Sequence, residues 1–162
     1  MTADEILNTP DTPEANFAAL GLHESLLRGI HDLGFTRPTP IQSQAIPPIL
    51  EGRDVVGIAQ TGTGKTAAFI LPILDRLLEE KSGPHVRALI VSPTRELALQ
   101  SIEHQQALAR HVPLKGLAVF GGVAMQPQIS ALAKGVDIIS ATPGRLLDHV
   151  YSGRIDFGAL EV

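Results

Sequence analysis

The chain has 162 residues, of which 44% are hydrophobic and only 4% are aromatic. This length and composition suit one domain with an aliphatic core and leave little room for a second domain. Thirteen Lys and Arg residues against seventeen Asp and Glu residues give a net charge of −4. Nucleic-acid binding through a globally basic surface is therefore excluded, and local donors would have to provide it.

The sequence contains no cysteine and six scattered histidines without paired metal spacing. A disulfide framework and a thiolate metal site are thus excluded, which fits a reducing compartment. The apolar stretches are far shorter than a membrane span, and the N-terminus lacks the basic start and apolar run of a signal peptide. We therefore expect a cytoplasmic protein with no membrane association.

Residues 1–16 carry acidic residues and prolines without hydrophobic periodicity, which predicts a mobile lead-in before a domain at residues 17–162. The domain begins with a predicted helix that ends at Gly34, where a left-handed C-terminal cap is wanted. Its apolar residues share one helical face: Leu22, Leu26, Ile30 and Leu33.

A second helix is predicted to begin with Thr39 as N-cap and Pro40 in the first turn. Gln42 then lies in that first turn. A glutamine amide offers a donor and an acceptor side by side, which can pair with the N6 and N7 edge of adenine but not equally with guanine. The alternative is an ordinary polar helix residue.

The segment Gln60-Thr61-Gly62-Thr63-Gly64-Lys65-Thr66 indicates a phosphate-binding loop. It follows the apolar run 54–58, which predicts a buried strand, and precedes apolar residues at helical spacing up to Leu78. Glycines there allow backbone N–H groups to surround a polyphosphate at a helix N-terminus. Lys65 would reach the β- and γ-phosphates, and the Thr66 hydroxyl would ligate Mg²⁺. Ala59 stands where the general pattern has glycine.

Three further strands are predicted at residues 86–92, 114–120 and 136–140, each followed by a helix. The P-loop helix is predicted to bend at Pro72 and to stop near Gly83-Pro84. The last helix is capped by Thr142 and closed by Gly153. Ala98, Ile102 and Ala109 share one side of the first of these helices, and the second is marked by Met125, Ile129, Leu132 and Ala133. The residues expected to face inward on the third are Leu146, Leu147 and Val150.

This alternation predicts an α/β fold, a three-layer parallel sheet with helices on both faces. Ligands of such sheets bind beyond the carboxyl ends of the strands. The P-loop, Thr94-Arg95, Gly121-Gly122 and residues 142–145 all follow a predicted strand directly, so we expect them at that edge.

Together these stretches resemble the first RecA-like, P-loop domain of DEAD-box RNA helicases. The resemblance covers roughly residues 17–162 and five ordered motifs. Residues 35–42 resemble the adenine-recognising Q motif, and residues 59–66 resemble motif I, whose family form begins with alanine. Residues 93–98 resemble motif Ia, Gly121-Gly122 the GG doublet, and residues 142–145 motif Ib.

The resemblance implies an ATP-dependent RNA helicase, a hydrolase with ATP and Mg²⁺ as cofactors and RNA as a sequence-independent partner. Lys65 and Thr66 would be catalytic. The nucleotide-binding residues it implies are Phe17, Phe35, Arg37, Gln42, Gln60, Thr61, Gly62, Thr63, Gly64, Lys65, Thr66 and Ala67. The RNA-binding residues are Pro93, Thr94, Arg95, Gly121, Gly122, Thr142, Pro143, Gly144 and Arg145.

Backbone N–H groups at helix N-termini and an arginine fork suit phosphates, which carry no base identity. The alternative for Arg95 and Arg145 is a structural ion pair, for instance with Glu96 or Asp148.

The acidic tetrapeptide that gives the family its name does not occur in the sequence, and neither does the family's second RecA-like domain with its arginine finger. We therefore expect a fragment of a helicase, possessing nucleotide and RNA sites but inactive in turnover by itself. A sheet cut short predicts self-association through its exposed edge. The rival functions are another P-loop ATPase, such as a nucleotide kinase or a DNA translocase, and a binding module without catalysis.

Overall fold

The computed structural model describes residues 16–79 and 85–162. The predicted lead-in, apart from Asn16, and the predicted helix stop at Gly83-Pro84 lie outside the described residues. The elements, in chain order, are η2 (Phe17–Leu20), α1 (Glu24–Asp32), α2 (Pro40–Leu50), α3 (Lys65–Leu78), β1 (Ala88–Val91), α4 (Arg95–Leu108), β2 (Gly116–Val119), α5 (Gln126–Ala133), β3 (Ile138–Ala141) and α6 (Pro143–Tyr151).

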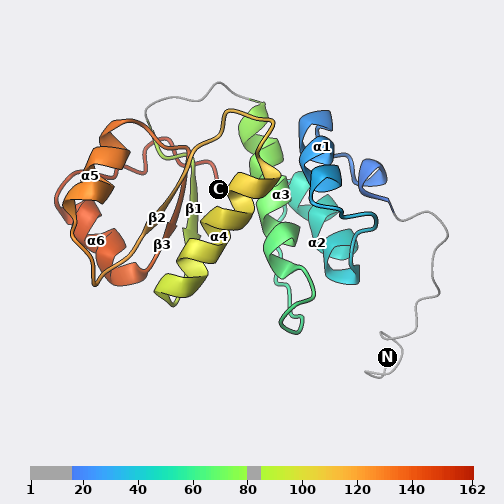
Figure 1. Cartoon of the computed structure of the whole chain (residues 1–162), viewed down its shortest axis with the longest axis horizontal. Coiled ribbons are helices and arrows are strands. Elements are labelled where there is room, and N and C mark those ends of the chain that lie inside the picture. The colour runs from blue at the N-terminus through green and yellow to red at the C-terminus, as the bar shows by residue number, and fades with distance from the viewer. Residues whose placement is uncertain (1–15, 80–84) are drawn as a thin grey trace.

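The three strands form a parallel sheet in the order β1-β3-β2. Helices α3 and α4 lie on one side of it and α5 and α6 on the other, while α1 and α2 pack on the far side of α3 (Figure 1). The predicted α/β fold with a helix-covered parallel sheet is confirmed. Each strand is shorter than its prediction.

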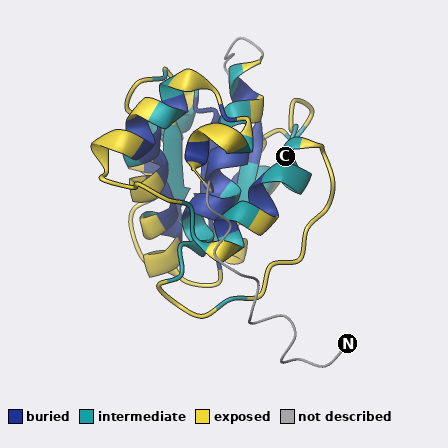
Figure 2. Cartoon of the chain, turned by 90° about the vertical axis from the view of Figure 1, so that its right-hand side faces the viewer, coloured by how far each residue is buried: buried dark blue, intermediate teal, exposed yellow. Residues whose placement is uncertain are grey.

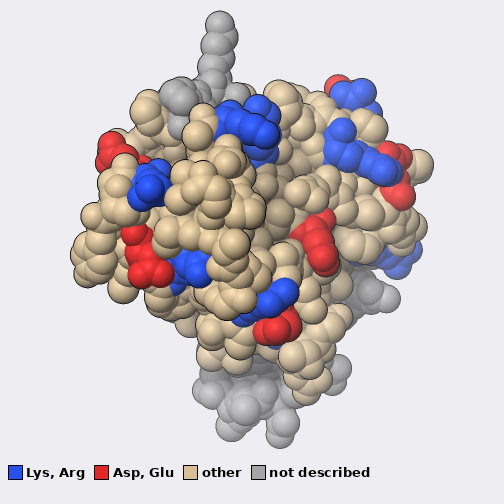
Figure 3. Space-filling model, turned by 60° about the vertical axis from the view of Figure 1, so that its left-hand side comes forward, with Lys and Arg blue, Asp and Glu red and all other residues tan. Residues whose placement is uncertain are grey.

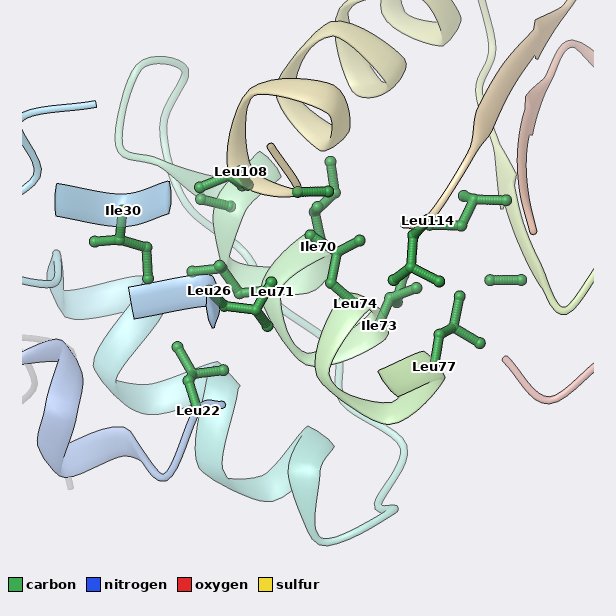
Figure 4. Close-up of a cluster of buried hydrophobic side chains, with 14 of the residues drawn as sticks. Leu22, Leu26, Ile30, Ile70, Leu71, Ile73, Leu74, Leu77, Leu108 and Leu114 are labelled. Carbon is green, nitrogen blue, oxygen red and sulfur yellow. The ribbon is translucent and has the colours of Figure 1, made fainter. Parts of the chain in front are cut away.

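Alternate residues of the strands enter two separate cores. Ala88 and Ile138 join the larger core with α1, α3 and the end of α4, whereas Leu89 and Ile139 join a smaller core under α6. This period of two is what a sheet covered on both faces requires. In the larger core, Leu26 of α1 lies beside Leu71 of α3, and Ile30 belongs to the same cluster (Figure 4). The buried sides of the helices face inward, and the connecting segments are mostly exposed (Figure 2).

The prediction of a buried strand at residues 54–58 is wrong. The segment belongs to no strand, and the side chains of Val56 and Ile58 are both 92% exposed. An apolar run becomes a strand only when a neighbouring strand pairs with its backbone. Here a cavity of about 520 Å³ separates the segment from β1, lined on one side by Val55 and Gly57 and on the other by residues 89–91.

The side of β1 that β3 does not cover is met by the last two residues of the sequence. Val162 N–H donates to the Arg87 carbonyl at 3.2 Å, and Leu89 N–H donates to the Val162 carbonyl at 3.0 Å. This is the hydrogen-bond pattern of parallel strands, centred on Ala88. An ion pair of 2.5 Å between Arg87 Nε and Glu161 Oε1 supports it.

The predicted helix ends and caps are largely confirmed. Gly34 has φ +74° after α1, Thr39 precedes α2 with Pro40 in its first turn, and Thr142 is the N-cap of α6. The inward face of α6 differs from the prediction. Leu147 is 47% exposed, and His149 is fully buried in its place.

Candidate nucleotide and nucleic-acid sites

The P-loop runs into the N-terminus of α3 through two glycines in the left-handed region, Gly62 at φ +82° and Gly64 at φ +85°. Gly64 is the N-cap of α3. Because glycine has no side chain, the cap residue leaves the first N–H groups of the helix uncovered. A Cβ on Gly62 would meet no heavy atom within 4 Å, so the loop is open to a ligand there. The geometry suits an anion at a helix N-terminus.

Lys65 folds back over this loop. Its ammonium donates to the carbonyl oxygens of Ala59 and, at 2.6 Å, Gln60. The Thr63 hydroxyl donates to the same Gln60 carbonyl at 2.7 Å. The loop therefore holds a cation at its mouth, where the phosphates of a nucleotide would compete with neutral carbonyl groups for the ammonium.

Gln42 links α2 to the P-loop from a buried position with 3% exposure. Its Oε1 accepts from the Thr39 N–H at 2.9 Å, and its Nε2 donates to the Gly64 carbonyl at 3.1 Å. The contact requires glycine at position 64, because a Cβ there would come within 2.5 Å of Gln42 Nε2. The structure thus brings Gln42 to the P-loop, and its pairing with adenine stays a prediction.

The other nucleotide-site predictions fall in different surroundings. Phe35 is 41% exposed and Arg37 is also exposed, so both are open to a ligand. Phe17 is 5% exposed and belongs to the larger core, so its ring is not presented at the surface. Thr66 lines the cavity beside β1 together with Lys65. Within residues 16–79 and 85–162 no group of three or more His, Asp or Glu side chains could hold a metal ion.

The carboxyl ends of the three strands lie level at one edge of the sheet. Ser92 N–H donates to the Ala141 carbonyl at 2.8 Å, and Thr142 N–H donates to the Val119 carbonyl at 2.9 Å. The three predicted RNA-binding stretches follow these strands directly and therefore share the edge. Most of their residues are exposed: Pro93, Thr94, Arg95, Gly121, Gly122, Pro143 and Gly144.

Two helices begin at this edge with threonine caps. The Thr94 hydroxyl accepts from the Leu97 N–H at 3.3 Å, which caps α4. Thr142 is the N-cap of α6 but makes no side-chain cap bond. Both N-termini add positive partial charge to the edge, which favours an anionic ligand.

Both predicted arginines are held by the protein. The Arg95 guanidinium lies 4.9 Å from the centroid of the Phe120 ring. Arg145 Nη2 donates to the Val123 carbonyl at 3.1 Å, and its Nε lies 3.5 Å from an Asp148 carboxylate oxygen. The alternative of an ion pair with Asp148 is therefore seen here, alongside the donation to the loop that follows β2.

Sequence reasoning missed a buried polar pair behind the Gly121-Gly122 loop. Gln128 of α5 donates from Nε2 to the Phe120 carbonyl at 3.0 Å. His149 of α6 contacts Gln128 Oε1 through Nε2 at 3.2 Å. The helical spacing carries a signal for both, since Gln128 lies one turn from Leu132 and His149 one turn from Leu146, on the faces expected to be apolar.

Burial is the main reason that the pKa of the His149 imidazole lies below its usual range. The positive charges of Arg145 and Arg154 lower the pKa further, against a smaller opposing effect of Asp148. His149 is therefore a neutral group at physiological pH.

Charges of both signs are interspersed on the face that Figure 3 presents, and most of that face is uncharged. This mixture agrees with the net charge of −4 and shows no large basic patch on that face. Of the helices in the described part of the chain, none combines the length and apolar character needed to span a membrane.

Comparison with known proteins places these features in a family. The chain is 50% identical to the ATP-dependent RNA helicase SrmB of Escherichia coli K12 over 148 residues, which are 90% of this chain and 33% of that protein. It is 44% identical to the DEAD-box ATP-dependent RNA helicase RhpA of Helicobacter pylori over 158 residues, 92% of this chain and 32% of that protein. Against the ATP-dependent RNA helicase dbp10 of Schizosaccharomyces pombe the identity is 44%, over 91% of this chain and 17% of that protein.

The chain thus spans a third or less of the length of these relatives. The DEAD/DEAH box helicase family matches residues 39–161, which include the P-loop and all three strand ends. The chain belongs to the DEAD/DEAH box helicase family.

Proposed function

We propose that this chain is the ATP-binding and RNA-backbone-binding part of an ATP-dependent RNA helicase that remodels or unwinds RNA duplexes. The observation that carries the proposal is the P-loop, because its glycines and Lys65 lie at the uncapped N-terminus of α3. The names of its relatives, ATP-dependent RNA helicases, support the same activity.

The residues of the loop fit a nucleotide triphosphate with Mg²⁺. Lys65 would exchange the carbonyls of Ala59 and Gln60 for phosphate oxygens, which bind an ammonium more strongly. Thr66 would provide a hydroxyl oxygen to the metal, and phosphate and water would provide the other ligands. The bound metal would neutralise charge on the phosphates.

Adenine recognition is assigned to Gln42, with Phe35 and Arg37 exposed on the same connection between α1 and α2. The bonds of Gln42 to Thr39 and Gly64 use one donor and one acceptor position of its amide. One N–H and one lone pair remain for N7 and N6 of adenine. Phe17 would have to act from the core, as support beneath the ligand.

RNA is assigned to the level strand ends, where Thr94, Gly121, Gly122, Thr142 and Gly144 present backbone and hydroxyl groups. Such groups bind phosphates without reading bases, so the contact would be independent of sequence. A second RecA-like domain would complete the site in the whole protein.

This chain by itself is proposed to bind without turnover. Hydrolysis requires a held metal, a positioned water and a cation on the transition-state charge, and an arginine finger alone contributes about 10³–10⁵ in rate. The alternatives are an inactive nucleotide- and RNA-binding module and another P-loop ATPase. RNA-stimulated ATP turnover by this chain would contradict the binding-only proposal, and a preference for guanine nucleotides would favour a different P-loop enzyme.

Two finer proposals concern the chain's surroundings. A location in the cytoplasm is consistent with the absence of cysteine. Self-association is proposed through the exposed apolar segment 54–58, where Val56 and Ile58 are 92% exposed.

The test is a calorimetric titration of this chain with Mg-ATP. Lys65→Ala removes a hydrogen bond to a charged group, so ATP affinity should fall about 10- to 150-fold. Lys134→Ala is the matched control, because Lys134 is exposed at the end of α5. Equal ATP affinity in the wild-type and Lys65→Ala chains, or no binding by either, would overturn the proposal.

A further inference from the structure

The loop that carries Gly121-Gly122 is held from behind by a chain of buried polar groups. Phe120 precedes the two glycines, and its carbonyl accepts from Gln128 Nε2 at 3.0 Å. Gln128 is 6% exposed, and His149, which contacts its Oε1, is fully buried. These two contacts therefore link α6 through α5 to the backbone at the sheet edge.

The Phe120 carbonyl fixes which group donates in each of these hydrogen bonds. A carbonyl oxygen only accepts, so the Gln128 amide must turn its NH₂ group toward Phe120 and its oxygen toward α6. His149 Nε2 then has to carry the proton and donate to Gln128 Oε1. With the proton on Nε2, Nδ1 is a bare lone pair, which agrees with a buried Nδ1 without a hydrogen-bond partner in the described part of the chain.

The other end of the loop is fixed by the same helix α6. Arg145 donates to the Val123 carbonyl at 3.1 Å, and Arg95 of α4 stacks on the Phe120 ring. The two glycines between these anchors are exposed, and Gly122 has φ +78°. Residues 120–123 are thus held at both ends, and the two exposed glycines between them lie at the edge assigned to RNA.

We propose that Gln128 is a positioning residue that sets the Gly121-Gly122 backbone for RNA phosphate binding, and that His149 holds the Gln128 amide in its donating orientation. The proposal rests on the proposed function, because it assigns RNA to this loop. Without the His149 proton, the amide could rotate and present its oxygen to the Phe120 carbonyl, and two acceptors would then face each other.

A purely structural role explains this pair less well. Two apolar side chains would fill the space between α5 and α6 without the cost of burying polar groups. A buried pair with directional hydrogen bonds instead specifies one arrangement of the backbone that it contacts. The charged groups that act on the pKa of His149 are Arg145 and Arg154, which lower it, and Asp148, which raises it.

The test compares two substitutions of the same residue. His149→Gln keeps an N–H donor close to the position of Nε2, whereas His149→Phe keeps the ring shape and removes the donor. Two quantities are measured in this chain: deuterium exchange of the Gly121 and Gly122 amides without RNA, and affinity for a fluorescent ten-residue oligouridylate. Gln128→Met removes the donor to Phe120, and Gln126→Met is its control, because Gln126 is exposed on the same helix.

We expect His149→Phe and Gln128→Met to weaken oligouridylate binding about 3- to 10-fold, the usual effect of one lost hydrogen bond, and to speed exchange at both glycines. His149→Gln should restore both quantities, and Gln126→Met should match the wild type. If ring shape matters instead, His149→Phe will match the wild type and His149→Gln will not, which overturns the proposal.

The two His149 variants still decide the matter if Gln128→Met does not fold. Oligouridylate that fails to bind the wild-type chain overturns the proposed function alone. The exchange measurement then supports the positioning role if His149→Phe speeds it and His149→Gln does not, and overturns that role if the two variants are alike.

Discussion

Under the proposed function, the Gln42 side chain would serve the fold and a nucleotide together. Its amide joins the first turn of α2 to the Gly64 carbonyl, and it keeps one N–H and one lone pair for a second partner. A residue placed in this way orders the P-loop before the nucleotide arrives. Affinity and base selectivity should then depend on the same amide.

Gln42→Ala should weaken ATP binding about 5- to 150-fold, since one bidentate pairing contributes about 1–3 kcal/mol. GTP binding should weaken less, because guanine does not use the pairing. Competition titrations with both nucleotides measure this ratio, and Gln44→Ala is the control, as Gln44 is exposed on α2. Adenine recognition by Gln42 is ruled out if the unmodified chain binds GTP as tightly as ATP.

His149 should make the free energy of unfolding depend on pH. Its pKa is lowered in the folded chain, so the unfolded chain binds the proton more readily and stability rises with pH. The contribution is complete above the unfolded pKa of about 6.5 and is lost as pH falls from there through the folded pKa. The slope from this one group is at most about 1.4 kcal/mol per pH unit.

Urea unfolding at a series of pH values between 5 and 8 tests this expectation in the wild type and in His149→Gln. The wild type should lose stability relative to the variant below about pH 6.5. Parallel curves for the two proteins would show that His149 does not titrate differently in the folded chain. The other histidines are common to both proteins and cancel in the comparison.

At the scale of elements, α1 crosses the end of α4 at Gly29. A Cβ at this position would lie 2.2 Å from the Leu108 carbonyl oxygen, which is backbone and cannot move aside cheaply. Gly29 lies inside a helix, where alanine is intrinsically favoured by about 1 kcal/mol. The clash is the larger effect, because it requires the two helices to separate.

Gly29→Ala should therefore lower the free energy of unfolding by about 1–3 kcal/mol, as overpacking of a tight contact does. Gly144→Ala is the matched control, since a Cβ there meets no heavy atom within 4 Å and α6 can accept it. Urea denaturation measures both. A Gly29→Ala chain as stable as the wild type would show that the crossing is looser than the structure indicates.

The elements that sequence predicts well are those with local signals. Gly34 after α1, Pro40 in the first turn of α2 and the Gly64-Lys65 start of α3 each depend on one turn of backbone. The segment 54–58 depends on a partner strand elsewhere, and no local pattern reports whether that partner is present. Its composition predicts a strand, yet it lies exposed beside a cavity.

The candidate site likewise has residues that the sequence predicts and residues that it does not. Motif residues at the strand ends follow from the βα alternation, because parallel strands bring their carboxyl ends to one edge. Helical spacing places Gln128 and His149 on the faces expected to be apolar, but polar residues are usually placed outside and Leu147 offers α6 an apolar alternative. Only the packing of α5 against α6 decides between them.

At the scale of the whole molecule, the exposed apolar segment 54–58 should govern association. Sedimentation velocity at rising concentration should show oligomers of the wild type. The double variant Val56→Lys and Ile58→Lys should remain monomeric, because charge on an exposed apolar segment opposes pairing. Lysines at the exposed Ser130 and Gln126 are the control for added charge. A wild type that stays monomeric throughout contradicts the self-association proposal.

The central claim is that a chain of net charge −4 binds RNA phosphates locally, at the level strand ends. The most direct test is the salt dependence of oligoribonucleotide binding by the wild type, by Arg145→Ala and by Arg154→Ala, which changes the same charge just beyond the other end of α6. We predict that Arg145→Ala weakens all RNA sequences by similar factors and reduces the log–log salt slope by about 0.7, one phosphate contact on a single strand. Arg154→Ala should leave the slope unchanged. An effect of Arg145→Ala confined to particular sequences, or equal slopes in all three chains, would contradict the account.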